Sequence, residues 1–541
     1  MGITIFNNAR IFTSSPQSED LFSGCLMIDN ETITYVGHSD GEEIARARAG
    51  GASEVDMENK VITPSFIDAH IHIMHLGQAL GKLNILSFKS FPEISHQIRT
   101  WAASNPSAPR ILCRGWLQAS TGGKALAAML DELDERPIYV EAMDLHSVWC
   151  NSAALEELGV ESMPDPPGGT IHRDSQGNPS GLLEEMAHLG IVVPFLTRVL
   201  SPEQAHMALH RAFLALSRAG YTGFIDMAMD DEQWSTILEY QRRKTLPIHV
   251  AAHWLIPYDE DIEHVQAHME RAIEMHAKYN PSTSPSLCVV GIKLIADGTV
   301  DGCTAALSKP YGAKDDPIEP IWPAAQLAAV VRQADEAGLQ VAIHAIGDRA
   351  VSEALDAFEQ LRRSPHSRRH RIEHLELTSD SDAMRLGNLG ITASVQPVHS
   401  DPVLFRAWPS LIGTHRCKRA FAYRDFHQHG SPLAFGTDAP TAAHYPLPNL
   451  YNATTRRSAL EPASRERTNA DFAVSLATAL KAATSGAAYS RHAETWTGSL
   501  QKGLSADFVV LETDWTADGL LAATVHQTWF RGRLVFDLPS S

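Results

Sequence analysis

The stretch Val61-Ile62-Thr63-Pro64-Ser65-Phe66-Ile67-Asp68-Ala69-His70-Ile71-His72 is an apolar run that ends in two histidines. Side chains on an extended strand alternate between its two faces, so residues two apart point the same way. We therefore predict a strand over residues 61–72 that aims the imidazoles of His70 and His72 at one point. Imidazole is a common ligand of transition metals, although the same spacing also occurs at half-buried polar strand edges.

The composition is typical of a folded globular protein. Of the 541 residues, 44% are hydrophobic and 20% are charged, and no apolar run reaches the roughly 18 residues that span a membrane. The formal net charge of -19 repels nucleic acid and anionic lipid surfaces, so we expect neither as a partner. The start has no signal-peptide pattern and the six cysteines form no CxxC pair, which favours a cytoplasmic location.

Short strand-like runs separated by turns occupy both ends of the chain. Examples near the start are Ile3-Thr4-Ile5-Phe6 and Thr32-Ile33-Thr34-Tyr35-Val36-Gly37. A similar strand-like run near the end is Ala506-Asp507-Phe508-Val509-Val510-Leu511. Neither region has a helical period. We predict that residues 1–60 and 490–541 pair into one small β-sandwich domain around a large insert.

Helices and strands alternate through much of this insert. Ser201-Pro202-Glu203-Gln204 has the residues of a capped helix start, and the helix runs to Gly220 before a strand begins. The same order of helix, glycine and strand recurs at Gly338, Gly387 and Gly430. Such alternation predicts βαβ units and a parallel sheet.

Eight apolar strands can be counted, which is the number that closes a (β/α)8 TIM-like barrel of the α/β class. The barrel then takes residues 61–73 plus 201–489. Residues 74–200 exceed the ~2–6 residues of an ordinary βα loop, so we predict an inserted subdomain after the first barrel strand that covers the active site. The strands are expected at 61–72, 221–228, 247–254, 288–296, 340–346, 370–375, 391–397 and 432–438.

Metal-binding residue types stand near the ends of five of these strands. The active site of such a barrel lies at the carboxyl ends of its strands, so we expect these side chains to meet. They are His70, His72, Lys293, His344, His374 and Asp438.

This set resembles the metal site of the amidohydrolase superfamily of metal-dependent hydrolases. Further motifs resemble its YtcJ-like, amidohydrolase-3 branch, which includes N-substituted formamide deformylase. The similarity covers nearly the whole chain, and no ligand of the pattern is missing. The motifs are Arg114-Gly115-Trp116, Asp144-Leu145-His146 with Asn151-Ser152-Ala153-Ala154-Leu155, Pro167-Gly168-Gly169-Thr170-Ile171, Gly181-Leu182-Leu183-Glu184-Glu185, His344-Ala345-Ile346-Gly347-Asp348 and Arg369-His370-Arg371-Ile372-Glu373-His374.

The resemblance implies one or two divalent metal ions, with zinc expected, held by the four histidines and Asp438. It also implies that CO2 converts Lys293 to a carbamate that bridges the cations. From the residues alone, Lys293 could instead pair with Asp297 or Asp301 or stay unmodified. The alternative for Asp438 is a helix cap, and for His344 and His374 it is a place in the core.

Other residues are candidates for the surroundings of the metal. We expect Arg114, Trp116, His146 and His399 to contact the substrate, although packing explains Arg114 and Trp116 as well. Asp348 follows His344 by four residues, where it could orient a ligand or cap a helix.

The expected function is hydrolysis of an amide, formamide or cyclic amide C–N bond in a small-molecule substrate. Asp438 and Lys293 are the expected catalytic residues, and Asp438 would accept the proton of the attacking water. One alternative keeps the metal barrel for an isomerase, decarboxylase or hydratase reaction, and another is a non-catalytic binding protein. A homodimer is expected only from the resemblance.

Overall fold

The computed structural model describes residues 2–143, 146–166, 169–312, 316–361 and 368–539. The chain divides into two compact units, Met1–Ile73 with Phe213–Ser541 and Met74–Ala212. Asp144-Leu145 and Pro167-Gly168, two pieces of the quoted motifs, lie outside the described residues. In the described ranges, no helix is both long and apolar enough to cross a bilayer.

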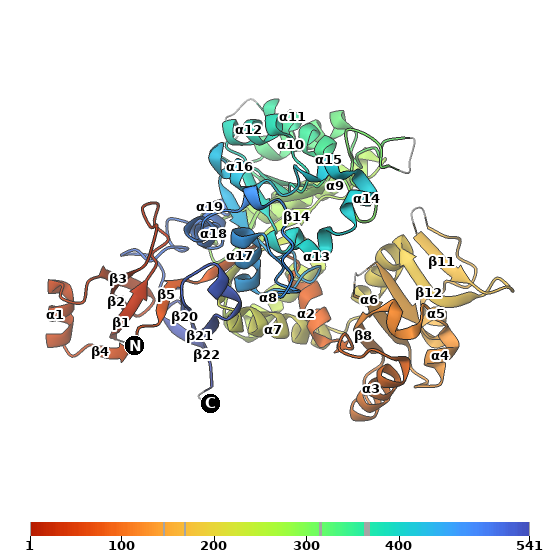
Figure 1. Ribbon diagram of the computed structural model, residues 1–541, viewed down its shortest axis with the longest axis horizontal. Coiled ribbons are helices and arrows are strands. Elements are labelled where there is room, and N and C mark those ends of the chain that lie inside the picture. The colour runs from red at the N-terminus through yellow and green to blue at the C-terminus, as the bar shows by residue number, and fades with distance from the viewer. Residues whose placement is uncertain (1, 144–145, 167–168, 313–315, 362–367, 540–541) are drawn as a thin grey trace. The chain divides into compact units, whose positions relative to one another are not determined.

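Eight parallel strands form a nearly closed barrel in the first unit, which confirms the predicted α/β barrel (Figure 1). Backbone hydrogen bonds bring its first and last strands together. The Asp438 N–H donates to the His70 carbonyl at 2.7 Å, and the His72 N–H donates to the Ala439 carbonyl at 3.0 Å. In spatial order the strands are β6 (Phe66–Ile71), β13 (Tyr221–Met229), β14 (His249–Leu255), β15 (Leu287–Ile295), β16 (Gln340–Ala345), β17 (Arg371–His374), β18 (Thr392–Val395) and β19 (Leu433–Phe435).

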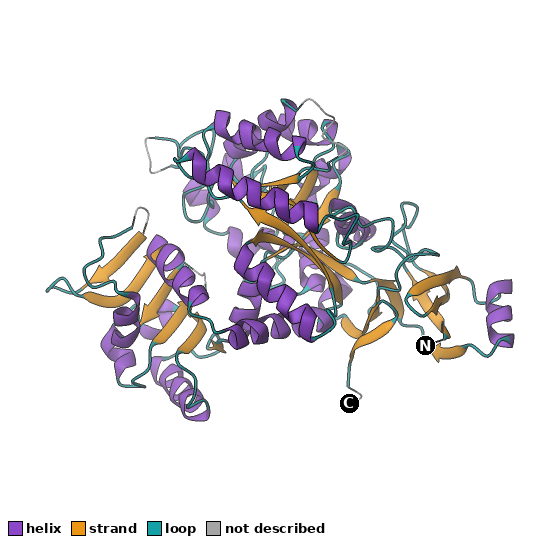
Figure 2. Ribbon diagram, turned by 180° about the vertical axis from the view of Figure 1, so that it is seen from behind, coloured by secondary structure: helices purple, strands orange, loops and turns teal. Residues whose placement is uncertain are grey.

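Helices alternate with these strands and flank them (Figure 2). The predicted capping box is present, because the Ser201 N–H donates to Gln204 Oε1 at 2.9 Å and the Gln204 N–H donates to Ser201 Oγ at 3.2 Å. The helices are α7 (Pro202–Arg218), α8 (Asp231–Arg243), α9 (Ile262–Lys278), α10 (Ala324–Glu336), α11 (Asp348–Glu359), α12 (Asp380–Asn388), α13 (Pro402–Phe405), α14 (Trp408–Ile412), α15 (Thr414–Cys417), α16 (Tyr423–Gln428), α17 (Pro446–Thr455), α18 (Leu476–Ala482) and α19 (Ser485–Ser490).

One predicted helix end is wrong. Gly387 lies inside α12, where a Cβ would come within 1.9 Å of the His429 carbonyl oxygen. The left-handed residue that follows α12 is Gly390, with φ +63°, whereas Gly338 and Gly430 have the predicted conformation at +91° and +87°. Gly387 is therefore a residue of close helix packing, a property that depends on a distant segment.

The predicted strand over residues 61–72 is divided between two sheets. β5 (Val61–Pro64) pairs with strands of the chain termini, and β6 belongs to the barrel. The change occurs at Ser65, whose N–H donates to the Asp507 carbonyl at 3.2 Å, while the next N–H, of Phe66, donates to Gly220 at 3.0 Å. Both strands are buried throughout, so the apolar pattern is continuous across the junction.

Strands from both ends of the chain form one eight-stranded sheet. β5 joins the two ends, because it lies between β1 (Ile3–Ile11) and β20 (Phe508–Glu512) and pairs antiparallel with β20. The predicted arrangement of this region as a sandwich, and its domain bounds, stay predictions. The strands are β1 (Ile3–Ile11), β2 (Phe22–Asp29), β3 (Thr32–Gly37), β4 (Ser53–Asp56), β5, β20 (Phe508–Glu512), β21 (Thr524–Phe530) and β22 (Arg533–Asp537), and α1 (Glu42–Ala49) precedes β4.

The second unit has its own six-stranded sheet and apolar core. Asn151 has a structural role in this unit. Its side-chain oxygen accepts from the backbone N–H groups of Ala154 and Ile138, both at 2.9 Å, so it caps α5 (Ser152–Leu158) and holds the start of β9 (Ile138–Ala142). That this segment covers the active site stays a prediction. The elements are α2 (Ile73–Gly81), β7 (Leu83–Asn84), α3 (Phe91–Ser104), β8 (Ile111–Trp116), α4 (Ala127–Asp131), β9 (Ile138–Ala142), β10 (Ser147–Cys150), α5 (Ser152–Leu158), β11 (Gly169–Arg173), β12 (Pro179–Glu185) and α6 (Val193–Arg198).

Candidate metal centre

His70, His72 and Asp438 meet at the carboxyl ends of β6 and β19. Asp438 Oδ1 lies 3.3 Å from His70 Nε2 and 3.1 Å from His72 Nε2. The three ligand atoms are thus close enough to bind one metal ion. His70 and Asp438 are buried, and barrel closure brings them together across the sequence. Burial alone would raise the pKa of Asp438, but the two histidines hold it well below its usual range.

His344 and His374 complete a row of imidazoles next to this group. The His374 ring lies 4.3 Å from that of His344 and 5.0 Å from that of His70, measured between ring centroids. His374 is the last residue of β17 and has φ +75°, and Asp438 has φ +58°. Non-glycine residues rarely adopt this conformation, and such strain concentrates at functional sites.

Lys293 on β15 is 2% exposed, and its Nζ has no hydrogen-bond partner or carboxylate within ion-pair distance among the described residues. Burial lowers the pKa of this amine to about 8, while the charges of Glu373 and Asp438 oppose the shift. The ion pair with Asp297 is therefore not formed. Asp297 instead accepts the backbone N–H groups of Ala306, Ile346 and Gly347 at 2.8–3.0 Å. Asp301 accepts the Trp408 indole N–H at 3.3 Å.

Two glutamates of this site were not among the predicted residues. Glu373 Oε2 lies 2.6 Å from His70 Nδ1, and Glu376 Oε1 lies 3.2 Å from His399 Nδ1. His374, Glu376 and His399 form a second group whose ligand atoms lie within 4.8 Å of one another. In the sequence, Glu373 stands directly before His374 and Glu376 two residues after it. Carboxylates are common in such segments, so this position alone did not identify the two glutamates as site residues.

His399 and Asp348 have different surroundings. His399 Nε2 lies 3.9 Å from Asp438 Oδ2, which puts this predicted substrate contact beside the metal-binding group. Asp348 begins α11, and its carboxylate accepts the backbone N–H and the hydroxyl of Ser308 at 2.8 and 2.5 Å. Its role in orienting a ligand stays a prediction. Asp297 is the carboxylate beside His344, at 3.7 Å from Nε2.

The remaining substrate candidates lie in the second unit. Trp116 is 1% exposed and packs against Trp149 at 5.4 Å in the apolar core, as the packing alternative expects. Arg114 lies on the same strand, β8, and is partly buried. His146 Nδ1 lies 2.9 Å from Glu185 Oε2. Substrate contacts of these residues stay predictions.

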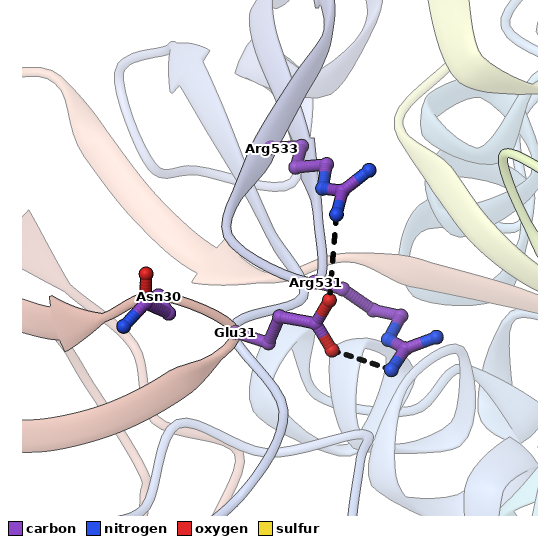
Figure 3. A pocket seen from close by; sticks show the side chains of 4 residues that line it. All are labelled: Asn30, Glu31, Arg531 and Arg533. Carbon is purple, nitrogen blue, oxygen red and sulfur yellow. Dashed lines mark hydrogen bonds and ion pairs between the residues drawn. The ribbon is translucent and has the colours of Figure 1, made fainter. Parts of the chain in front are cut away.

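A surface pocket in the terminal sheet contains none of these residues. It is lined by Asn30, Glu31, Arg531 and Arg533, and Glu31 forms ion pairs with both arginines (Figure 3). The carboxylate therefore offsets much of the positive charge that an anionic ligand would need.

The donor set of the barrel fits a divalent transition metal. Neutral imidazoles and a carboxylate are the ligands that such ions prefer. The Nε2 atoms of His70 and His72 both face Asp438 Oδ1. In the described parts of the chain, His374 Nδ1 and Lys293 Nζ are buried without hydrogen-bond partners. Buried polar atoms of this kind ordinarily have partners, so their grouping indicates a bound ion.

A family model described as "Amidohydrolase family" matches residues 53–536. The chain belongs to the amidohydrolase family. This confirms the resemblance noted in the sequence, and membership makes the protein an enzyme of the hydrolase class. The match begins at β4 and extends through the barrel and the inserted segment of this amidohydrolase to β22, whereas β1, β2, β3 and α1 precede it.

Individual relatives agree with this membership. The chain is 27% identical to "Putative amidohydrolase YtcJ" of Bacillus subtilis, covering 90% of each chain. It is 23% identical to "N-substituted formamide deformylase" of Arthrobacter pascens, covering 95% of this amidohydrolase and 94% of the relative. An uncharacterized metal-dependent hydrolase from Pyrococcus horikoshii has the same fold, with a TM-score of 0.76, 24% identity and coverage of 96% and 98%.

Proposed function

We propose that this amidohydrolase is a metal-dependent enzyme that hydrolyses the C–N bond of an amide, formamide or cyclic amide in a small organic molecule. The observation that carries the proposal is the meeting of His70, His72 and Asp438 at the carboxyl ends of the barrel strands, where Asp438 Oδ1 lies within 3.3 Å of Nε2 of each histidine. Family membership supports hydrolysis, and the relative named as a formamide deformylase supports the class of bond.

The ligands in this proposal are His70, His72, His344, His374 and Asp438, holding one or two divalent ions with zinc as the expected metal. A divalent ion bound there would lower the pKa of a coordinated water towards neutrality and polarise the substrate carbonyl. The histidines can serve as ligands at neutral pH, because burial lowers the pKa of His344 to about 3 and that of His374 well below its usual range.

We assign Asp438 the proton transfers. Its carboxylate is ionised, faces His70 and His72 and lies at the carboxyl ends of the barrel strands, so it can accept the proton of the attacking water. The same group then returns this proton to the leaving amine. The expelled nitrogen thereby leaves as a neutral amine.

Lys293 is proposed to be carboxylated by CO2, with the carbamate as an additional bridging ligand. Only the neutral amine reacts with CO2, and burial lowers the pKa of Lys293 to about 8. The absence of an ion-pair partner for its Nζ among the described residues also favours conversion over a bare buried ammonium.

We further propose a cytoplasmic location, a small-molecule substrate and a homodimer. All six cysteines are free thiols, which agrees with a reducing compartment. The net charge of -19 makes nucleic acid an unfavourable partner. The substrate is expected to contact His399 together with Arg114, Trp116 and His146.

A substrate screen in isotopically labelled water tests the reaction. Purified enzyme loaded with Zn²⁺ is incubated with formamides, N-acyl amines and cyclic amides in H2 18O. We expect one class to yield an acid that contains solvent oxygen. Turnover that leaves the label out of the product would instead support an isomerase or decarboxylase reaction.

Replacing Asp438 by asparagine removes the proton acceptor and keeps a ligand of similar shape. We expect Asp438→Asn to lower kcat by about 10²–10⁴-fold, the usual contribution of a general base, with metal content near that of the wild type. Asp425→Asn is the control, since Asp425 pairs with Arg419 at 2.7 Å in the same unit. Wild-type turnover in Asp438→Asn would remove this residue from the mechanism.

A further inference from the structure

Arg371 and Glu373 form a charged pair inside the barrel. Both are 0% exposed, and both lie on β17, two residues apart, so they face the same side of the strand. Arg371 Nε donates to Glu373 Oε1 at 2.5 Å, and Arg371 Nη2 donates to Glu373 Oε2 at 3.2 Å. A buried guanidinium is always charged and needs a carboxylate counterion, so Glu373 is ionised.

Glu373 fixes the proton on His70. An ionised carboxylate can only accept hydrogen bonds, so the 2.6 Å contact between Glu373 Oε2 and His70 Nδ1 places a proton on Nδ1. In the neutral ring the lone pair is then on Nε2. This atom faces Asp438 Oδ1 at 3.3 Å, where two acceptors repel each other unless a cation lies between them.

The pair is tied to three further elements. Arg371 Nη2 donates to the carbonyl of Ala69 on β6 at 2.7 Å, next to His70. The hydroxyl of Ser394 on β18 accepts from Arg371 at 2.5 Å and donates to Glu373 Oε2 at 2.6 Å, and Ser490 of α19 accepts from Arg371 at 3.2 Å. Glu373 Oε2 is therefore held by Arg371, His70 and Ser394, and Oε1 is held by Arg371, which fixes the orientation of the carboxylate.

We propose that Arg371 and Glu373 are positioning residues that prepare His70 to bind metal, by holding its ring and keeping its Nε2 lone pair directed at Asp438 before the metal arrives. The inference rests on the proposed metal-dependent function, because it concerns a ligand of that metal. Partners of metal-binding histidines that act in this way typically contribute 10–100-fold to metal affinity.

Titration of the metal-depleted full-length protein with Co²⁺ tests this inference. We expect Glu373→Gln to weaken Co²⁺ binding by about 10–100-fold and to change the visible spectrum of the bound ion. The amide can donate to Nδ1, which would move the ring proton to Nε2 and remove the lone pair. Glu494→Gln is the matched control, since Glu494 pairs with Arg369 at 2.6 Å and should leave both readouts unchanged.

Ser394→Ala provides a second variant if Glu373→Gln does not fold. It removes one hydrogen bond to the carboxylate and keeps the ion pair, so we expect a smaller but measurable loss of Co²⁺ affinity. Co²⁺ affinity and spectrum equal to the wild type in a folded Glu373→Gln protein, or in Ser394→Ala if only that variant folds, would overturn the inference. A wild-type protein that binds no Co²⁺, Zn²⁺ or Mn²⁺ would instead refute the proposed function.

Discussion

Lys293 illustrates how the surroundings of one residue decide its chemistry. Its amine is buried, and the charges of Glu373 and Asp438 favour the ammonium form although neither carboxylate is a direct partner. Burying an ammonium without a partner costs several kcal/mol, so a neutral or carboxylated state is favoured. The sequence indicated the position of this lysine on a strand, but its lack of an ion pair appears only when the strands are assembled.

Carboxylation of Lys293 can be measured directly. Protein equilibrated with ¹³C-bicarbonate and Zn²⁺ should show a carbamate resonance that is lost in Lys293→Met. Lys82→Met should keep it, because Lys82 already pairs with Glu141 at 2.8 Å. A resonance that persists in Lys293→Met would assign the carbamate to another amine, and its absence from the metal-loaded wild type would contradict the bridging role.

At the scale of elements, the site depends on how β6 and β19 approach each other. Gly436 directly follows β19, and a Cβ there would lie 2.4 Å from the His70 backbone nitrogen. This close approach allows the hydrogen bond from the Asp438 N–H to the His70 carbonyl at 2.7 Å. The spacing between the predicted ligands is thus set by a residue that has no side chain.

Gly436→Ala should separate the two strands. Because the methyl group meets backbone rather than a flexible side chain, we expect a loss of about 1–3 kcal/mol in stability and a lower metal content. Thermal unfolding and metal analysis of the purified variant measure both. Gly50→Ala is the control, since its Cβ would meet only ordinary contacts, the nearest at 3.4 Å. A Gly436→Ala protein with wild-type stability would contradict the close packing.

For the whole molecule, the terminal sheet and the barrel are joined by a buried polar contact. His249 of β14 lies 3.0 Å from Asp507 Oδ2 through Nε2 and 2.7 Å from Ser286 Oγ through Nδ1. The Thr497 hydroxyl also donates to Asp507 at 2.8 Å. Burial lowers the pKa of His249. Burial alone would raise the pKa of Asp507, but its contacts with His249, the Arg531 backbone N–H and the Thr497 hydroxyl hold it below its usual value.

Both shifts predict that acid weakens the fold. Below about pH 6.5 this histidine is protonated in the unfolded chain, whereas buried His249 stays neutral in the folded protein. The free energy of unfolding therefore falls as the pH decreases below about 6.5. Asp507, with its depressed pKa, adds a further loss at lower pH. We expect His249→Gln to flatten the dependence of Tm on pH between 7 and 5, while exposed His415→Gln leaves it unchanged. An unaltered slope in His249→Gln would contradict this assignment.

The sequence by itself determined the eight-stranded barrel and placed the four histidines, Lys293 and Asp438 near strand ends, because strand periodicity, helix caps and turn glycines are local properties. Only the tertiary structure decided that residues 61–64 pair with the terminal strands and that Gly387 packs within a helix. It also decided that Glu373 contacts His70, 303 positions away. These features depend on contacts between distant segments, which form only when the chain folds and which no local pattern encodes.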